Sequence, residues 1–110
     1  MILDVMVDTQ EVKIQIPEEM LSQSQAFFDK MDKDMDAGRR LGPTYVENLD
    51  VIQRAQIVAD RLLTAIETEN QGLAQLMAAY IVTRIKNVQL VNIDINGDPL
   101  NTEIILSQGA

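Results

Sequence analysis

Cysteine, histidine and tryptophan are all absent from the 110 residues of the chain. The lack of cysteine excludes disulfides, thiolate nucleophiles and thiolate metal sites. The lack of histidine removes the usual general base near neutral pH and the commonest ligand of zinc, copper and haem. A catalytic role would have to use carboxylates, lysines, tyrosines or a bound cofactor, with Asp60 and Glu67 as weak candidates for a carboxylate pair. We lean toward a protein that is not an enzyme, and we predict no metal site and no cofactor.

Basic residues are few as well. The chain has 17 acidic and 9 basic residues, and its net charge of -8 works against binding to nucleic acid or to anionic lipid. No stretch approaches the roughly eighteen consecutive apolar residues that identify a membrane span. The first residues also lack the basic and apolar regions of a secretory signal. We therefore expect a cytoplasmic protein whose partners include neither nucleic acid nor a membrane.

Apolar and polar residues alternate near both ends of the chain, which predicts two β-hairpins. The segments that show this alternation are residues 2–7, 12–16, 91–95 and 100–106. Asn96-Gly97-Asp98-Pro99 supplies turn residues between the last two segments, and a four-residue turn there pairs Val91 with Ile104.

Between the hairpins, apolar residues recur at steps of three and four, which predicts helices over residues 17–37 and 48–86. The sequence therefore predicts a single α+β domain over residues 1–110, in the order ββ-α-α-ββ. In this arrangement the two hairpins form an antiparallel sheet, and two or three helices pack on one of its faces.

The second helical region decides the shape of the molecule. Asn48 is a plausible N-cap, and the region either continues to residue 86 or breaks at Asn70-Gln71-Gly72. Glu67 and Glu69 would lie unfavourably in the last turn of a broken helix, so we favour one long helix. At about 1.5 Å per residue it would be nearly 60 Å long, and a second subunit would be needed to cover part of it.

Small and apolar residues on this region have two interpretations. Tight packing against the protein's own sheet or first helix is one, and a seam that a partner helix approaches closely in a homodimer is the other. The residues that would form the dimer interface are Val58, Leu62, Ala65, Gly72, Leu76 and Ala79.

The first helix carries an apolar stripe and an acidic end. Met and Phe residues in the stripe, including Phe27, indicate core packing more often than a docking surface. Asp32-x-Asp34-x-Asp36 matches the opening of an EF-hand loop, but Pro43 stands where the motif requires a bidentate Glu. We therefore interpret the acidic end as solvated and not as a metal site.

Residues 38–45 form the longest predicted irregular connection and hold the only concentrated positive charge. Arg39 and Arg40, with Tyr45 as a hydrogen-bonding wall, form our candidate site for a small anionic ligand. The alternative is structural: Gly38 ends the first helix, and the arginines offset its dipole and its acidic flank.

These observations favour a protein-association role, with a homodimer built through the long helix or an exposed strand. The alternative is a binding module or accessory subunit that takes an anionic ligand at the Arg39 and Arg40 loop. The sequence contains no catalytic motif that would favour an enzyme.

Overall fold

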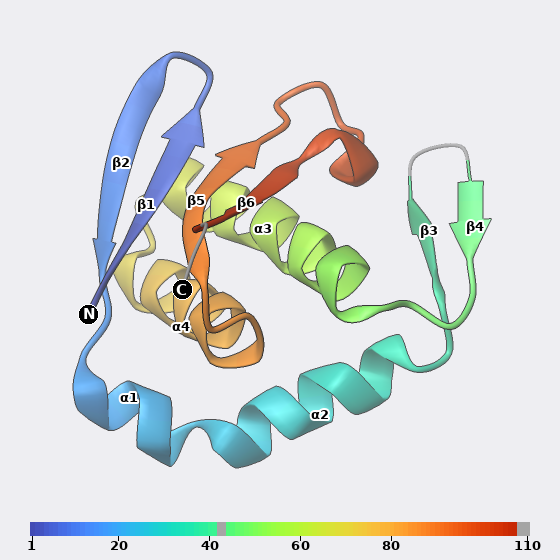
Figure 1. The fold of residues 1–110 in the computed structure, drawn as a ribbon, viewed down its shortest axis with the longest axis horizontal. Coiled ribbons are helices and arrows are strands. Elements are labelled where there is room, and N and C mark those ends of the chain that lie inside the picture. Colours follow the sequence, from blue (N-terminus) through green and yellow to red (C-terminus); the bar gives the residue numbers. More distant parts are fainter. Residues whose placement is uncertain (42–43, 108–110) are drawn as a thin grey trace.

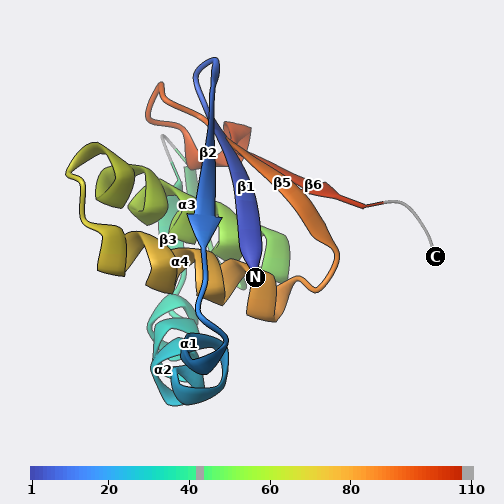
Figure 2. The same cartoon turned by 90° about the vertical axis from the view of Figure 1, so that its left-hand side faces the viewer.

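A four-stranded sheet forms one layer of the computed structural model, which describes residues 1–41 and 44–107. Its strands are β1 (Ile2–Val7), β2 (Gln10–Gln15), β5 (Val88–Ile93) and β6 (Glu103–Leu106). The helices lie on one face of this sheet in two layers, as Figure 2 shows. The predicted α+β class with helices on one face is confirmed.

The sheet is mixed, so the prediction of an antiparallel sheet was wrong. Its strand order is β2-β1-β5-β6. Each hairpin is antiparallel, but β1 and β5 join the hairpins as parallel neighbours, with Val5 opposite Val91. In the described residues all the α-helices lie between β2 and β5. So long a crossover allows β5 to run in either direction beside β1.

The turn of the second hairpin is longer than predicted. Val91 pairs with Ile104, as expected, but the strands end at Ile93 and resume at Glu103. The carboxylate of Asp94 accepts the backbone N–H groups of Asn96 and Asp98 at 3.0 and 2.9 Å. A short 3-10 helix over Pro99–Asn101 then completes the connection, because local side-chain bonds replace the strand pairing there.

The first predicted helix is two helices in sequence, α1 (Glu18–Gln23) and α2 (Gln25–Met35). Only Ser24 separates them, and backbone hydrogen bonds continue on both sides of it. Gly38, at φ +89°, lies just beyond α2 and donates its N–H to Met35. α2 therefore ends two residues before the predicted boundary at residue 37, and Gly38 belongs to the turn that follows it.

Two short strands replace part of the predicted irregular connection. β3 (Arg39–Leu41) pairs with β4 (Thr44–Val46) as a separate two-stranded sheet. Figure 1 shows this hairpin between α2 and α3, to one side of the main sheet. A side chain at Gly38 would meet the Val46 carbonyl oxygen at 2.8 Å. β4 therefore passes directly beside Gly38, just beyond the end of α2.

The second helical region breaks, and the long helix that we favoured is wrong. α3 (Val51–Glu67) and α4 (Gln71–Arg84) form an antiparallel pair (Figure 1). The Asn70 and Glu69 N–H groups donate back to the Ala65 and Ile66 carbonyls at 2.8 and 3.2 Å, the two bonds of a Schellman motif. Asn70 then caps α4 by accepting the Leu73 N–H at 3.2 Å.

The start of α3 also differs from the prediction. Its N-cap is Asp50, which forms a reciprocal capping box with Gln53, and Asn48 adopts a positive φ of 54° outside the helix. None of the helices in the described residues is long and apolar enough to cross a membrane.

The reversal gives a molecule whose principal extents are 35 × 34 × 34 Å instead of a rod of about 60 Å. It also places most of the predicted interface inside the chain. Val58, Leu62, Ala65 and Ala79 are fully buried, Leu76 is partly buried, and Gly72 is exposed. These residues follow the alternative interpretation of packing within the chain, so the expected seam for a partner helix has no support.

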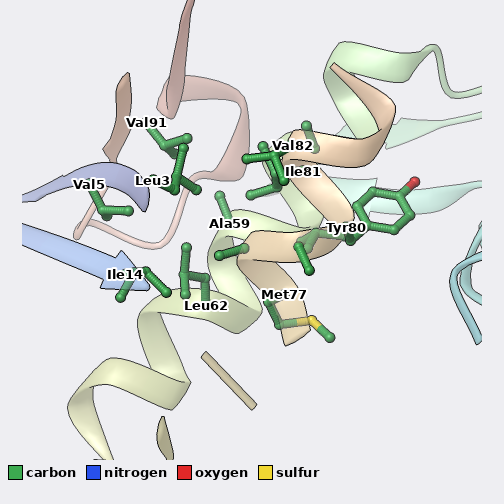
Figure 3. Packing of buried hydrophobic residues seen from close by; sticks show 14 of the residues in the cluster. Leu3, Val5, Ile14, Ala59, Leu62, Met77, Tyr80, Ile81, Val82 and Val91 are labelled. Carbon is green, nitrogen blue, oxygen red and sulfur yellow. The ribbon is translucent and has the colours of Figure 1, made fainter. Parts of the chain in front are cut away.

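The core lies between the sheet and the α3–α4 pair (Figure 3). Leu3, Val5 and Val91 of the sheet point toward Leu62 and Ile81 of the helices. α4 is buried on successive residues from Met77 to Val82, because it lies against α3 and the sheet and is also covered by α1 (Figure 2). A helix that is apolar all round is typical of such a central position.

Replacing Glu69 with glycine is expected to stabilise the protein. Glu69 holds a left-handed φ of 57°, which costs an L-residue about 1–2 kcal/mol, while glycine loses about 0.5–1 kcal/mol more backbone entropy on folding. We expect Glu69→Gly to raise the free energy of unfolding by about 0.5–1 kcal/mol, measured by urea denaturation. Glu67→Gly, at the last helical residue of α3, is the control. Its backbone is already helical, so glycine there should lower the free energy of unfolding by about 0.5 kcal/mol. A loss of stability in both variants would contradict this assignment.

Candidate functional site

The predicted anion site lies on the β3–β4 hairpin, where Arg40 and Tyr45 are partners in register. The side chains of Arg39 and Arg40 lie outside the described part of the structure. Tyr45 is exposed, and its hydroxyl donates to the Ala37 carbonyl oxygen at 2.8 Å. This bond gives Tyr45 a role in attaching the hairpin to the end of α2, and the anion site stays a prediction.

The densest polar cluster joins α2 to the helical pair through the carboxylate of Asp32. One carboxylate oxygen accepts a hydrogen bond from the Tyr80 hydroxyl, and the other accepts a hydrogen bond from Nε of Arg84 at 2.8 Å. Arg84 also reaches Asp29 at 3.0 Å. Its guanidinium lies over the ring of Phe28. Arg84 also donates to the side-chain oxygen of Gln25 at 3.3 Å, so two residues of α4 contact four residues of α2.

Arg54 of α3 completes this cluster. Its guanidinium contacts Asp36 at 2.7 Å and the Asp32 carboxylate at 3.5 Å, and it donates to the Asp32 backbone carbonyl at 2.8 Å. Asp50 lies four residues before Arg54, a spacing that permits an ion pair on a helix. Asp50 caps α3 instead, and Arg54 contacts Asp32 of α2 and Asp36 just beyond it.

The cluster controls the ionisation of its central groups. Partial burial raises the pKa of Asp32. The hydrogen bonds from Tyr80 and Arg84 and the positive charges of Arg84 and Arg54 lower this pKa, and together they outweigh the effect of burial. The pKa of Asp32 therefore lies below its usual value. Burial, and then the bond to Asp32, raise the pKa of Tyr80. Asp32 is thus an ionised acceptor at neutral pH, the opposite of the raised carboxyl pKa that a general acid requires.

The surface that α2 forms with the helical pair contains an apolar pocket of about 280 Å³. Phe27 comes from α2, and Leu73 and Met77 come from α4. Met77 is buried, whereas Phe27 and Leu73 remain 45 % and 36 % exposed. The three residues that complete the lining are Asp60, Arg61 and Thr64 of α3. We call this surface, defined by these six residues, the Phe27 pocket.

Asp60 and Arg61 carry opposite charges on the lining of this pocket. Both are exposed, and within the described chain neither side chain makes an ion pair or a hydrogen bond to another residue. The residues three and four positions from Arg61 are apolar or uncharged, so no neighbour on α3 neutralises it. Unpaired charges are ordinary on a protein surface, but these two lie beside exposed apolar side chains.

The two edges of the main sheet differ in character. On β2, Lys13 pairs with Asp4 at 2.9 Å and with Glu11 at 3.0 Å, and charges of this kind protect an edge from pairing with another chain. β6 has one charged residue, Glu103, and exposes Ile105 and Leu106. The β6 edge is therefore the less protected of the two.

Sequence reasoning missed the Phe27 pocket. It treated the stripe around Phe27 as core, but only Phe28, Met31 and Met35 of α2 are buried. Of the weak carboxylate pair, Asp60 lines the pocket and Glu67 does not. A helical wheel would have placed Phe27 beside the buried stripe, but it could not have shown that Leu73 lies next to it.

No protein-family model, curated protein or solved structure matches the chain. The contacts, burial and charges of the described residues are therefore the basis for inferring function. Within those residues, no group of three or more acidic side chains is arranged to hold a metal ion.

Replacing Asp32 with asparagine should expose its role as the centre of the cluster. Asp32→Asn is expected to lower the free energy of unfolding by about 1–3 kcal/mol at pH 7, because charged hydrogen bonds to two residues are lost. Since folding lowers the pKa of Asp32, its contribution is complete above the unfolded pKa of about 3.9 and disappears as the pH falls through the folded value. The measurement is urea denaturation at several pH values.

The matched control is Asp34→Asn on the same helix. Asp34 is exposed and its side chain makes no ion pair or hydrogen bond in the described chain, so its replacement should change stability by less than about 0.5 kcal/mol. Equal effects of the two substitutions, or a difference that persists unchanged at pH 2, would contradict the assignment.

Proposed function

We propose that this protein is a non-enzymatic protein-association module that forms a homodimer through the Phe27 pocket. The observation that carries the proposal is the exposure of Phe27 and Leu73 on the lining of a pocket that also includes the buried side chain of Met77. Exposed apolar residues are ordinary when they are scattered, but a cluster around a concave surface is typical of an interaction site.

The fold supports this role by holding the pocket in a fixed shape. Phe27 belongs to α2, which the Asp32 cluster ties to both α3 and α4. Its ring also packs edge-on against Phe28, at 6.3 Å between centroids, and Phe28 packs in turn on Tyr80. A partner would meet an aromatic side chain that is already ordered, so little conformational entropy is lost on binding.

Phe27 and Leu73 should act as the anchors of the homodimer. We expect the wild-type protein to sediment as a dimer at micromolar concentration, and Phe27→Glu to weaken the dimer by at least about 2 kcal/mol, or about thirtyfold in Kd. Leu73→Glu should weaken it as well, and an acidic residue is well placed in the first turn of α4. Analytical ultracentrifugation over a concentration series measures both effects.

Val51→Glu is the matched control for these variants. Val51 is 46 % exposed at the start of α3, outside the pocket lining, and an acidic residue there suits the helix dipole. Its replacement should leave the dimerisation constant unchanged. A wild-type protein that stays monomeric at every accessible concentration would remove the proposal.

The unprotected β6 edge is a second surface through which two copies could pair, by continuing the sheet from one copy into the other. Ile105→Lys tests this route, with Ile2→Lys as the control because Ile2 is exposed on the central strand β1. If the Phe27 pocket forms the contact, both variants should sediment like the wild type. A loss of the dimer in Ile105→Lys alone would transfer the contact to the sheet edge.

A further inference from the structure

We infer that the homodimer is two-fold symmetric and that Asp60 of each copy pairs with Arg61 of the other. This inference rests on the proposed function and specifies the geometry of the contact. It starts from two adjacent, oppositely charged side chains of α3 that both line the Phe27 pocket and are both unpaired in the described chain.

Two-fold symmetry makes this pair of charges self-complementary. In such a dimer the same surface of each copy meets, and if residue i contacts residue j, then j contacts i. When two copies of α3 lie parallel on either side of a two-fold axis that runs along them, Asp60 meets the Arg61 of the partner subunit and Arg61 meets the Asp60 of the partner subunit. Both contacts form at once, and the exposed parts of Phe27 and Leu73 lie at the same interface.

The charge of the whole chain makes such a device useful. Each copy carries a net charge of -8, so two copies repel one another at long range. Opposite charges that meet at the interface oppose this repulsion. They also select one register of the two subunits, because any register that brings like charges together is unfavourable. A second copy always presents the same two charges in the complementary arrangement, so the charges of the pocket fit a second copy.

Charge reversal tests the inference with two single variants, Asp60→Lys and Arg61→Glu. Each variant puts two charges of one sign on the surface, so both contacts across the axis become repulsive and we expect Kd to rise at least tenfold. In an equimolar mixture the two variants carry opposite signs, and a heterodimer should form with an affinity close to that of the wild type. Sedimentation and native mass spectrometry, after tagging one variant, distinguish the heterodimer from the homodimers.

Lys33 and Asp34 provide the matched control, since they are adjacent opposite charges on the exposed face of α2 and lie outside the pocket lining. Lys33→Glu and Asp34→Lys should leave Kd unchanged. Circular dichroism and urea denaturation check that every variant is folded.

The outcomes separate this inference from the proposed function. A wild-type dimer whose Kd is unchanged in both single variants overturns the Asp60–Arg61 contact and leaves the homodimer standing. Weakened variants that fail to form the heterodimer also overturn it, because the charges then act without meeting each other. A monomeric wild type overturns both the contact and the proposed function.

Discussion

The reversal of the chain at Glu69 and Asn70 is the constraint on which the rest of the structure depends. Two backbone hydrogen bonds end α3 there, and the Asn70 side chain begins α4 within a few residues. α4 can then return alongside α3, where it is covered by the sheet and by α1 (Figure 2). The same reversal brings Leu73 and Met77 beside Asp60 and Thr64. Without it, there would be neither a central helix nor a Phe27 pocket.

The Asp32 cluster supplies the second constraint, because it holds α2 against the α3–α4 pair. A partly buried carboxylate is costly unless several donors compensate for its lost hydration. Asp32 receives donors from Tyr80 and Arg84, and Arg54 approaches the same group. The acidic end of α2 is therefore not simply solvated, as the sequence suggested. Three of its aspartates, Asp29, Asp32 and Asp36, contact arginines of α3 or α4.

The charges of the Phe27 pocket contrast with those of this cluster. Arg54 and Arg84 are each satisfied inside the chain, whereas Arg61 and Asp60 are exposed beside apolar side chains without a partner in the described residues. Fully hydrated surface charges contribute little to stability. The same charges become more effective when a second surface excludes water from them, so their contribution would come from assembly and not from the folding of a single copy.

Local pattern determined the elements of this protein. Alternation predicted both hairpins and the pairing of Val91 with Ile104, and three- and four-residue spacing predicted the helical regions. The break within the second region was harder to predict, because a glutamate, Glu69, occupies the left-handed position that glycine usually marks.

Tertiary structure alone decided how these elements meet. The parallel pairing of β1 with β5, the burial of Val58 and Leu62 by the chain itself, and the contacts of Arg54 and Arg84 with α2 all join residues that lie far apart in the sequence. Periodicity describes only the face of one helix or strand. Which face meets which, and which charges are left without a partner, is decided by the packing of the whole chain.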